Sequence, residues 1–245
     1  MTLGSTQASA AMTPPASDTL QLLALAAALG WASGFRAFLV LFAVGVAGLA
    51  GWVHLPGGLQ VLASPVAVGI TGVLALAEFI GDKIPGVDSL LDFISTLLRI
   101  PMGALLAASV FGLDHGFVAA LAAAAGGSLA AVSHGTKLTT RAAINTSPEP
   151  FSNVGASFGE DALVLGGLWL SWAHPLVFFA ALVLVLIAMV WLARKSFRFV
   201  RSLLGKMVRL FSGRPEPGPP MPPAPSPRPL PPMHDVTDVH VQDKP

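Results

Sequence analysis

The most constraining feature of the sequence is an eighteen-residue stretch, residues 176–193, that contains no charged side chain. At about 1.5 Å per residue, a helix of this length spans most of the roughly 30 Å hydrocarbon core of a bilayer. The remaining chain has a similar character, with 53% hydrophobic and 11% charged residues, whereas a soluble protein has about 25% charged residues. The sequence therefore predicts an integral membrane protein built from α-helices.

Further apolar runs predict an all-α, polytopic transmembrane helix bundle with about six spans. The spans are expected at residues 19–50, 61–81, 88–111, 116–134, 158–173 and 176–193. The first run is too long for one straight span, so it must tilt, project or break, and a broken first helix is expected to have its break at Gly30 and Gly34. Because six spans divide into two sets of three, the sequence is compatible with a 3+3 inverted repeat.

Four parts of the chain differ in composition. Residues 1–17 predict a disordered N-terminal arm, residues 18–193 the transmembrane domain, residues 194–211 a basic amphipathic helix, and residues 212–245 a proline-rich, disordered cytoplasmic tail. Seven of the 14 Lys and Arg residues lie between Arg194 and Arg214. Because basic loops stay in the cytoplasm, we expect both termini on the cytoplasmic side of a bacterial inner membrane.

The composition also excludes several classes of function. The net charge of +1 gives no field that would attract nucleic acid, and the absence of cysteine excludes disulfides, thiolate metal sites and cysteine nucleophiles. We find no nucleophile and base in an arrangement typical of an enzyme, and no motif for a cofactor. We therefore predict a protein that is not an enzyme and binds no cofactor.

Residues 194–211 carry basic and apolar side chains at helical spacing, so that the two kinds fall on separate faces of a helix. Phe197, Val200 and Leu204 fall on one face, and the basic residues Arg194, Arg198, Arg201 and Arg209 fall on another. This pattern is typical of a helix that lies on an anionic leaflet, so these arginines are candidates to bind lipid headgroups. A signal that fixes the topology is the alternative, and both readings can hold together.

Charged residues within apolar spans are costly, at about 2.5–3.5 kcal/mol each on insertion scales, and usually face a partner or a cavity. Here they gather toward the predicted cytoplasmic side. The candidates for binding a substrate or ion are Arg36, Glu78, Asp82, Lys83, Asp88, Asp92, Arg99, His134, Lys137, Arg141, Glu160 and Asp161.

One stripe of these residues lies on the predicted third helix. Asp88, Asp92 and Arg99 share one face, and Arg99 lies about 16 Å along the helix from Asp88, close to the membrane midplane. The stripe predicts either a polar path that leads to a buried guanidinium or structural roles. In the structural reading, the acidic residues stabilise the helix N-terminus and Arg99 pairs with a carboxylate of another helix.

A second stripe follows the fourth span. His134, Lys137 and Arg141 are spaced by three and four residues, which places them on one face of a helix. Such a face could hold a phosphate or a carboxylate ligand. It could equally pair with Glu160 and Asp161 of the next helix, and the spacing alone does not separate these alternatives.

Three histidines are weak candidates for a metal site. His54, His115 and His174 fall one in each predicted outer loop and could bind zinc if they converged. Lone loop histidines are usually solvated, so we predict no metal.

Two charged motifs resemble one known family. The first is residues 78–89, EFIGDKIPGVDS, with Arg99 and the PMGA of residues 101–104. The second is formed by His134, Lys137, Arg141, Ser147, Pro148 and the SFGED of residues 157–161. Over about residues 20–195 the chain resembles the bacterial membrane family catalogued as domain of unknown function 4126. The resemblance implies the architecture and the place of a site, and no reaction.

Three functional hypotheses follow. The leading one is a small-solute transporter or channel with a charged cavity open to the cytoplasm, in which Arg99 binds the anionic side of a solute. The second is a non-transport scaffold that recruits lipid or a partner and whose buried charges are structural. An intramembrane enzyme is the third. As partners we expect anionic membrane lipids; a small polar or anionic solute and a homo-oligomer stay open.

Overall fold

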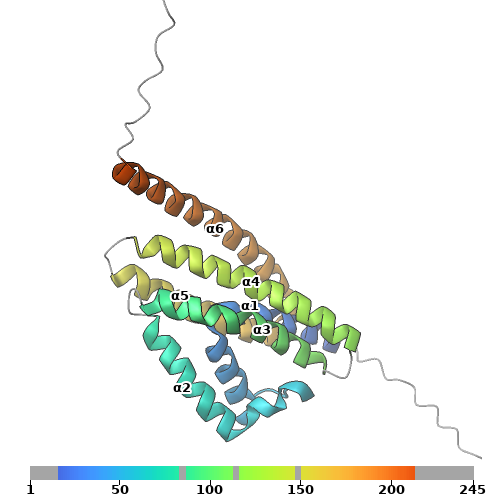
Figure 1. Ribbon diagram of the computed structural model, residues 1–245. Helices are drawn as coiled ribbons and strands as arrows, with labels where there is room; N and C mark the ends of the chain where they lie inside the picture. The colour runs from blue at the N-terminus through green and yellow to red at the C-terminus, as the bar shows by residue number, and fades with distance from the viewer. Residues whose placement is uncertain (1–15, 83–86, 113–115, 147–149, 213–245) are drawn as a thin grey trace, which may run out of the picture. The chain divides into compact units, whose positions relative to one another are not determined.

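The protein is built from helices. A computed structural model describes residues 16–82, 87–112, 116–146 and 150–212, leaving aside the side chains of residues 16–17, 87–95, 150 and 209–212. In chain order the elements are α1 (Ala16–Leu49), the 3₁₀-helix η1 (Gly57–Ala63), α2 (Pro65–Gly81), α3 (Val87–Phe111), α4 (Gly116–Ile144), α5 (Pro150–Ala173) and α6 (Pro175–Ser212) (Figure 1). The described residues contain no β-strand, so the all-α class is confirmed.

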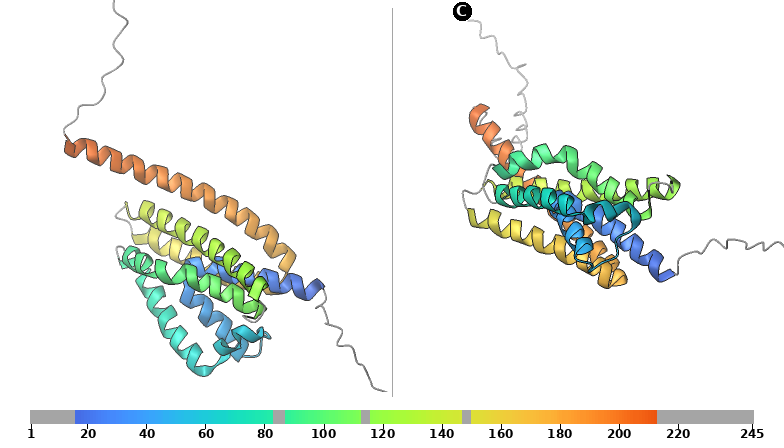
Figure 2. Two further views of the ribbon diagram at one scale, coloured as in Figure 1. Left: turned by 45° about the vertical axis from the view of Figure 1, so that its right-hand side comes forward. Right: turned by 90° about the horizontal axis from the view of Figure 1, so that it is seen from below.

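Helix α1 lies at the centre of the bundle. The chain divides into two units, Met1–Leu204 and Gly205–Pro245, and the core lies within the first. There α1 contacts η1, α2, α3, α4 and α5, and α3 packs along α4 (Figures 1 and 2). Leu29 and Val40 of α1 and Val164 of α5 are fully buried. The predicted arm and proline-rich tail lie largely outside the described residues.

The ends of the helices follow from local sequence. Helices α2, α5 and α6 each begin with proline, which suits the first helical position because its missing N–H needs no partner there. Ser64 caps α2 by accepting a hydrogen bond from the Ala67 N–H at 3.2 Å. Gly51 and Gly112 have φ of 70° and 80° just after α1 and α3, a conformation that favours glycine at a helix C-terminus.

Small residues allow α1, α3 and α4 to pack at close range. A Cβ atom added to Gly30 of α1 would lie 2.5 Å from the Gly126 Cα of α4, and one added to Gly103 of α3 would lie 2.6 Å from the Ala130 Cβ. Gly34 is as close to the backbone of α4 at Ala130. Since lipid tails give no hydrophobic drive between helices, this close contact is a main source of packing energy.

We predict that Gly126→Ala destabilises the protein by about 1–3 kcal/mol, the usual cost of overpacking. The new Cβ would meet the Gly103 carbonyl oxygen at 2.7 Å, which forces α3 and α4 apart. Gly135→Ala in the same helix is the matched control, because a Cβ there meets no atom within 4 Å. Thermal unfolding in detergent measures both variants, and equal shifts in midpoint would contradict the packing account.

The first helix is broken, as predicted, but not at a glycine. Arg36 has φ −145° and ψ 80°, which separates two helical halves, residues 16–35 and 37–49. Gly30 and Gly34 lie within the first half and serve the contact with α4 instead. The sequence prediction misplaced the break because glycine marks both helix breaks and close packing in membrane helices.

Within the described residues, three helices are long and apolar enough to cross a membrane: Asp18–Leu49, Gly116–Ile144 and Pro175–Val208. Helices η1 and α2, bent by 75° relative to each other, give a fourth if they count as one span. The described apolar part of α3 is shorter, Thr96–Phe111, and α5 is not among the candidates. These helices define an integral membrane protein, whereas six spans and an inverted repeat remain predictions.

Helix α6 combines two segments that the sequence analysis separated. One continuous helix, Pro175–Ser212, includes both the predicted span 176–193 and the predicted basic helix 194–211. The left view of Figure 2 shows this helix along its length. No proline interrupts it after Pro175. Arg194 therefore continues directly from the uncharged stretch, one turn after Val190.

Candidate functional site

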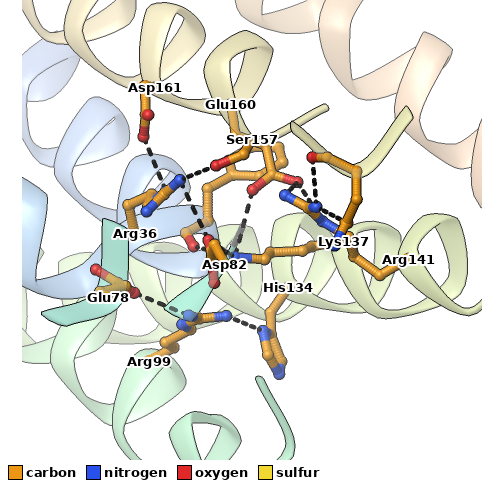
Figure 3. A network of polar contacts seen from close by, with 12 residues as sticks. Arg36, Glu78, Asp82, Arg99, His134, Lys137, Arg141, Ser157, Glu160 and Asp161 are labelled. Atoms are coloured by element: carbon orange, nitrogen blue, oxygen red, sulfur yellow. Dashed lines mark hydrogen bonds and ion pairs between the residues drawn. The ribbon is translucent and has the colours of Figure 1, made fainter. Parts of the chain in front are cut away.

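The break in α1 brings Arg36 into contact with two other helical elements. Its guanidinium forms ion pairs with Asp82, just after α2 (3.2 Å), and with Asp161 of α5 (2.9 Å), and Nη2 donates to the Ser157 hydroxyl of α5 at 2.7 Å (Figure 3). The Phe79 ring lies 5.9 Å from the guanidinium carbon. Arg36 is only 1% exposed, so these groups replace its hydration.

Asp82 and Lys137 form the most deeply buried pair. Lys137 Nζ of α4 donates to Asp82 Oδ2 at 2.8 Å, and both side chains are fully buried. Nζ also donates to the Phe35 carbonyl oxygen at 3.3 Å, directly before the break in α1. The ammonium thereby satisfies a carbonyl at a helix end, where a positive charge is favoured.

Asp82 is the residue that follows α2, and it remains a carboxylate. Burial acts to raise the pKa of its carboxyl group. The charges of Lys137 and Arg36 outweigh burial, so this pKa lies below its ordinary value. Asp82 is therefore ionised at neutral pH and available to both cations.

Glu160 of α5 joins two basic residues of α4. Its carboxylate lies 3.3 Å from Lys137 Nζ and 3.2 Å from Arg141 Nη2. Arg141 Nη1 also donates to the Asn153 carbonyl oxygen at 2.9 Å and to the Asn153 side-chain oxygen. These contacts fix the end of α4 against the first three turns of α5.

A second branch of contacts surrounds Arg99 of α3. Nη2 donates to Glu78 Oε1 of α2 at 2.8 Å, and Nη1 lies 3.4 Å from His134 Nδ1 of α4. Because a guanidinium only donates, Nδ1 must be the acceptor, so a neutral ring carries its proton on Nε2. Nε2 then donates to the Thr96 hydroxyl at 2.7 Å.

Together the charged residues form one buried group with balanced charge, which we call the charge cluster. It consists of the cations Arg36, Arg99, Lys137 and Arg141 and the carboxylates Glu78, Asp82, Glu160 and Asp161 (Figure 3). Four basic and four acidic side chains give a formal net charge of zero. Five helices, α1 to α5, contribute a residue or an adjacent residue, so the cluster ties the bundle together.

The cluster still has capacity to bind a further donor. Glu78 Oε2 and Asp82 Oδ1 are buried and have no hydrogen-bond partner among the described residues. Buried carboxylate oxygens without a partner are costly, and they are the atoms to which a proton or a water molecule could bind.

For the basic stripe of α4, the structure shows pairing with a carboxylate of the next helix. His134, Lys137 and Arg141 share one buried face, and Lys137 and Arg141 pair with Glu160. Arg99 pairs with Glu78 of another helix, with Nη2 and Oε1 2.8 Å apart. Lys83 and the side chains of Asp88 and Asp92 lie outside the described residues, so the acidic half of the α3 stripe stays a prediction.

Neutral polar members of the site were not predicted as site residues. Thr96 lies three residues before Arg99, and Asn153 lies seven residues, or two helical turns, before Glu160. These spacings place each of them on the same helix face as a charged residue, and that signal could have found them.

The outer histidines form no metal site in the described part of the chain. No group of three or more His, Cys, Asp or Glu side chains could hold a metal ion there. His54 and His174 are exposed, and His115 lies outside the described residues. His174 instead packs against the edge of Trp169.

The fold and the cluster define a class: an α-helical membrane protein whose central helices carry a buried, charge-neutral ion-pair cluster. Residues 23–195 match the model of one family, described as a domain of unknown function (DUF4126), and the chain belongs to this family. The match contains the whole charge cluster and stops where the basic part of α6 begins. No curated protein and no solved structure matches the chain.

Proposed function

We propose that the protein is a proton-coupled transporter of a small polar or anionic solute, with the charge cluster as its working centre. The observation that carries this proposal is a group of eight mutually paired charges, seven of them on buried residues, which includes Arg36 at the break in α1. Broken helices with charged residues near the break are typical of substrate and ion sites in secondary transporters.

Stability alone gives little reason for such a cluster. Each charge in a membrane helix costs about 2.5–3.5 kcal/mol on insertion scales. Replacing a buried ion pair by apolar side chains is often neutral or stabilising. A bundle that needed only to hold together could rely on the close glycine contacts of α1, α3 and α4, so the charges point to an additional task.

In this mechanism the Glu78 carboxylate and the solute compete for the same cation, Arg99. A proton that binds the Glu78 carboxylate removes the negative charge that holds Arg99. The released guanidinium can then donate two parallel hydrogen bonds to a carboxylate or phosphate of the solute. Loss of the proton restores the Glu78–Arg99 pair and expels the anion. With both termini in the cytoplasm, as we propose, the site would open toward the cytoplasm.

Arg36 provides a means to couple binding to movement. Its backbone forms the break in α1, and its guanidinium holds carboxylates of two other elements. Protonation of either carboxylate would weaken the contact that fixes the angle between the two halves of α1. The break would then serve as a hinge, as discontinuous helices do in alternating access.

A scaffold is the second candidate, and the internal pairing of the charges favours it. Each of the four cations of the cluster lies within 3.3 Å of a carboxylate oxygen. In this reading the cluster is a lock between helices, and the exposed basic part of α6 binds lipid or a partner. The two candidates differ in whether protons cross the membrane together with a solute.

Reconstitution into liposomes tests the transport proposal. Liposomes that enclose a pH-sensitive dye are given an inward pH gradient, and inorganic phosphate, succinate or glutamate is added outside. We expect one of these probes to accelerate acidification of the interior several-fold over protein-free liposomes. If none of these probes changes the rate of acidification, the result would favour the scaffold, in which the cluster only holds the helices together.

A further inference from the structure

Helix α6 carries a groove in which an apolar half meets a basic half. The groove has a volume of about 540 Å³ and is lined by Leu186, Ile187, Val190, Trp191, Arg194 and Arg198. Leu186, Val190, Arg194 and Arg198 are each four residues apart, and Ile187 and Trp191 lie beside them at the same spacing, so the six residues form one continuous face of the helix. The groove begins in the uncharged stretch and ends beyond it, where a spanning helix would reach the lipid headgroups.

The basic half of the groove has no acidic counterpart on its own helix. Residues 175–212 contain six Lys and Arg residues and no Asp or Glu. Arg198 Nε donates to the Arg194 carbonyl oxygen at 3.3 Å, which holds the Arg198 side chain back toward Arg194. Two guanidiniums thus line the same end of one groove, and an anion is the ligand that such a pair favours.

The apolar half suits a hydrocarbon chain. Ile187 and Trp191 are 63% and 59% exposed, so their surfaces would face lipid in a membrane. Lys195 Nζ lies 5.0 Å from the Trp191 ring centre, a cation–π contact that holds a third positive charge at the same level. Tryptophan next to basic residues is the usual arrangement at the boundary between acyl chains and headgroups.

We propose that this groove is a binding site for one anionic phospholipid. Its phosphate would accept hydrogen bonds from Arg194 and Arg198, and an acyl chain would lie along Leu186, Ile187 and Val190. Charge complementarity selects an anionic over a zwitterionic lipid, because a choline headgroup would bring a cation next to two guanidiniums. The site is independent of the charge cluster and of transport.

Native mass spectrometry of the full-length protein in detergent tests this site. Dioleoyl phosphatidylglycerol and dioleoyl phosphatidylcholine are titrated separately onto wild type and Arg194→Gln/Arg198→Gln. A charge-matched control, Lys206→Gln/Arg214→Gln, removes two positive charges that lie after the groove in the sequence. We expect the groove variant to bind the first phosphatidylglycerol about tenfold more weakly than wild type, the control to stay within about twofold, and phosphatidylcholine to bind weakly throughout.

Any of four results would overturn the proposal. Equal losses of affinity in the two variants would show that the lipid is attracted to the basic surface in general. No loss in either variant would show that Arg194 and Arg198 do not bind the lipid. Equal affinity of the wild type for the two lipids would show that the site does not select an anionic headgroup. Glycerophosphoglycerol, which carries the headgroup without acyl chains, should not compete at the lipid's concentration. Competition by it would show an anion site that uses no acyl-chain contact.

Discussion

Asp82→Ala should be the most damaging single substitution in the charge cluster, with an expected loss of about 3–5 kcal/mol in the free energy of unfolding. The fully buried Asp82 carboxylate neutralises both Lys137 and Arg36, so its removal leaves one uncompensated positive charge in the centre of the bundle. We expect low membrane yield and a lowered melting temperature in detergent.

Asp18→Ala is the control for the loss of a carboxylate. Asp18 is exposed in the first turn of α1, where a negative charge contributes about 0.3–1 kcal/mol at the helix N-terminus. Asp82→Asn separates charge from shape, because the amide is similar in size but carries no charge. A melting temperature of Asp82→Asn equal to that of wild type would contradict the electrostatic role of Asp82.

Arg99→Gln should cost nearly as much, because it leaves the buried Glu78 carboxylate without the cation at 2.8 Å. The double variant Glu78→Gln/Arg99→Gln removes both charges of the pair, so it should recover most of the loss of about 3–5 kcal/mol. Melting temperatures of the two single variants and the double variant form a double-mutant cycle. A double variant as unstable as the sum of the single variants would show that the two residues act independently.

The positions of the helices could be predicted largely from hydropathy. Apolar runs located the six described α-helices, but the end of α4 was placed ten residues early, at residue 134 instead of 144, and α6 was divided at residue 193 into a span and a separate basic helix. The prediction ended the spans where charges begin, near His134 and Arg194. In α4 the helix continues because Lys137 and Arg141 find carboxylates inside the protein, which hydropathy does not register.

The members of the candidate site could be predicted, but their pairing could not. Charge within an apolar span singled out all eight residues of the charge cluster, because such residues are rarely placed in membrane helices without a partner. The sequence left Arg99 free to bind an anion or a carboxylate. Its partner Glu78 lies on a different helix, so the choice depends on how α2 and α3 pack, which no local pattern encodes.

The most direct test of the central claim is the proton flux of Glu78→Gln/Arg99→Gln in liposomes. This variant removes a neutral pair, so it should fold and insert like wild type, and any loss of function cannot be assigned to unfolding. If the charge cluster is the working centre of a proton-coupled transporter, the variant should melt within a few degrees of wild type but lose the acidification that the active probe drives in wild type. Solute-driven acidification equal to that of wild type would contradict the claim and leave the cluster as a lock between helices.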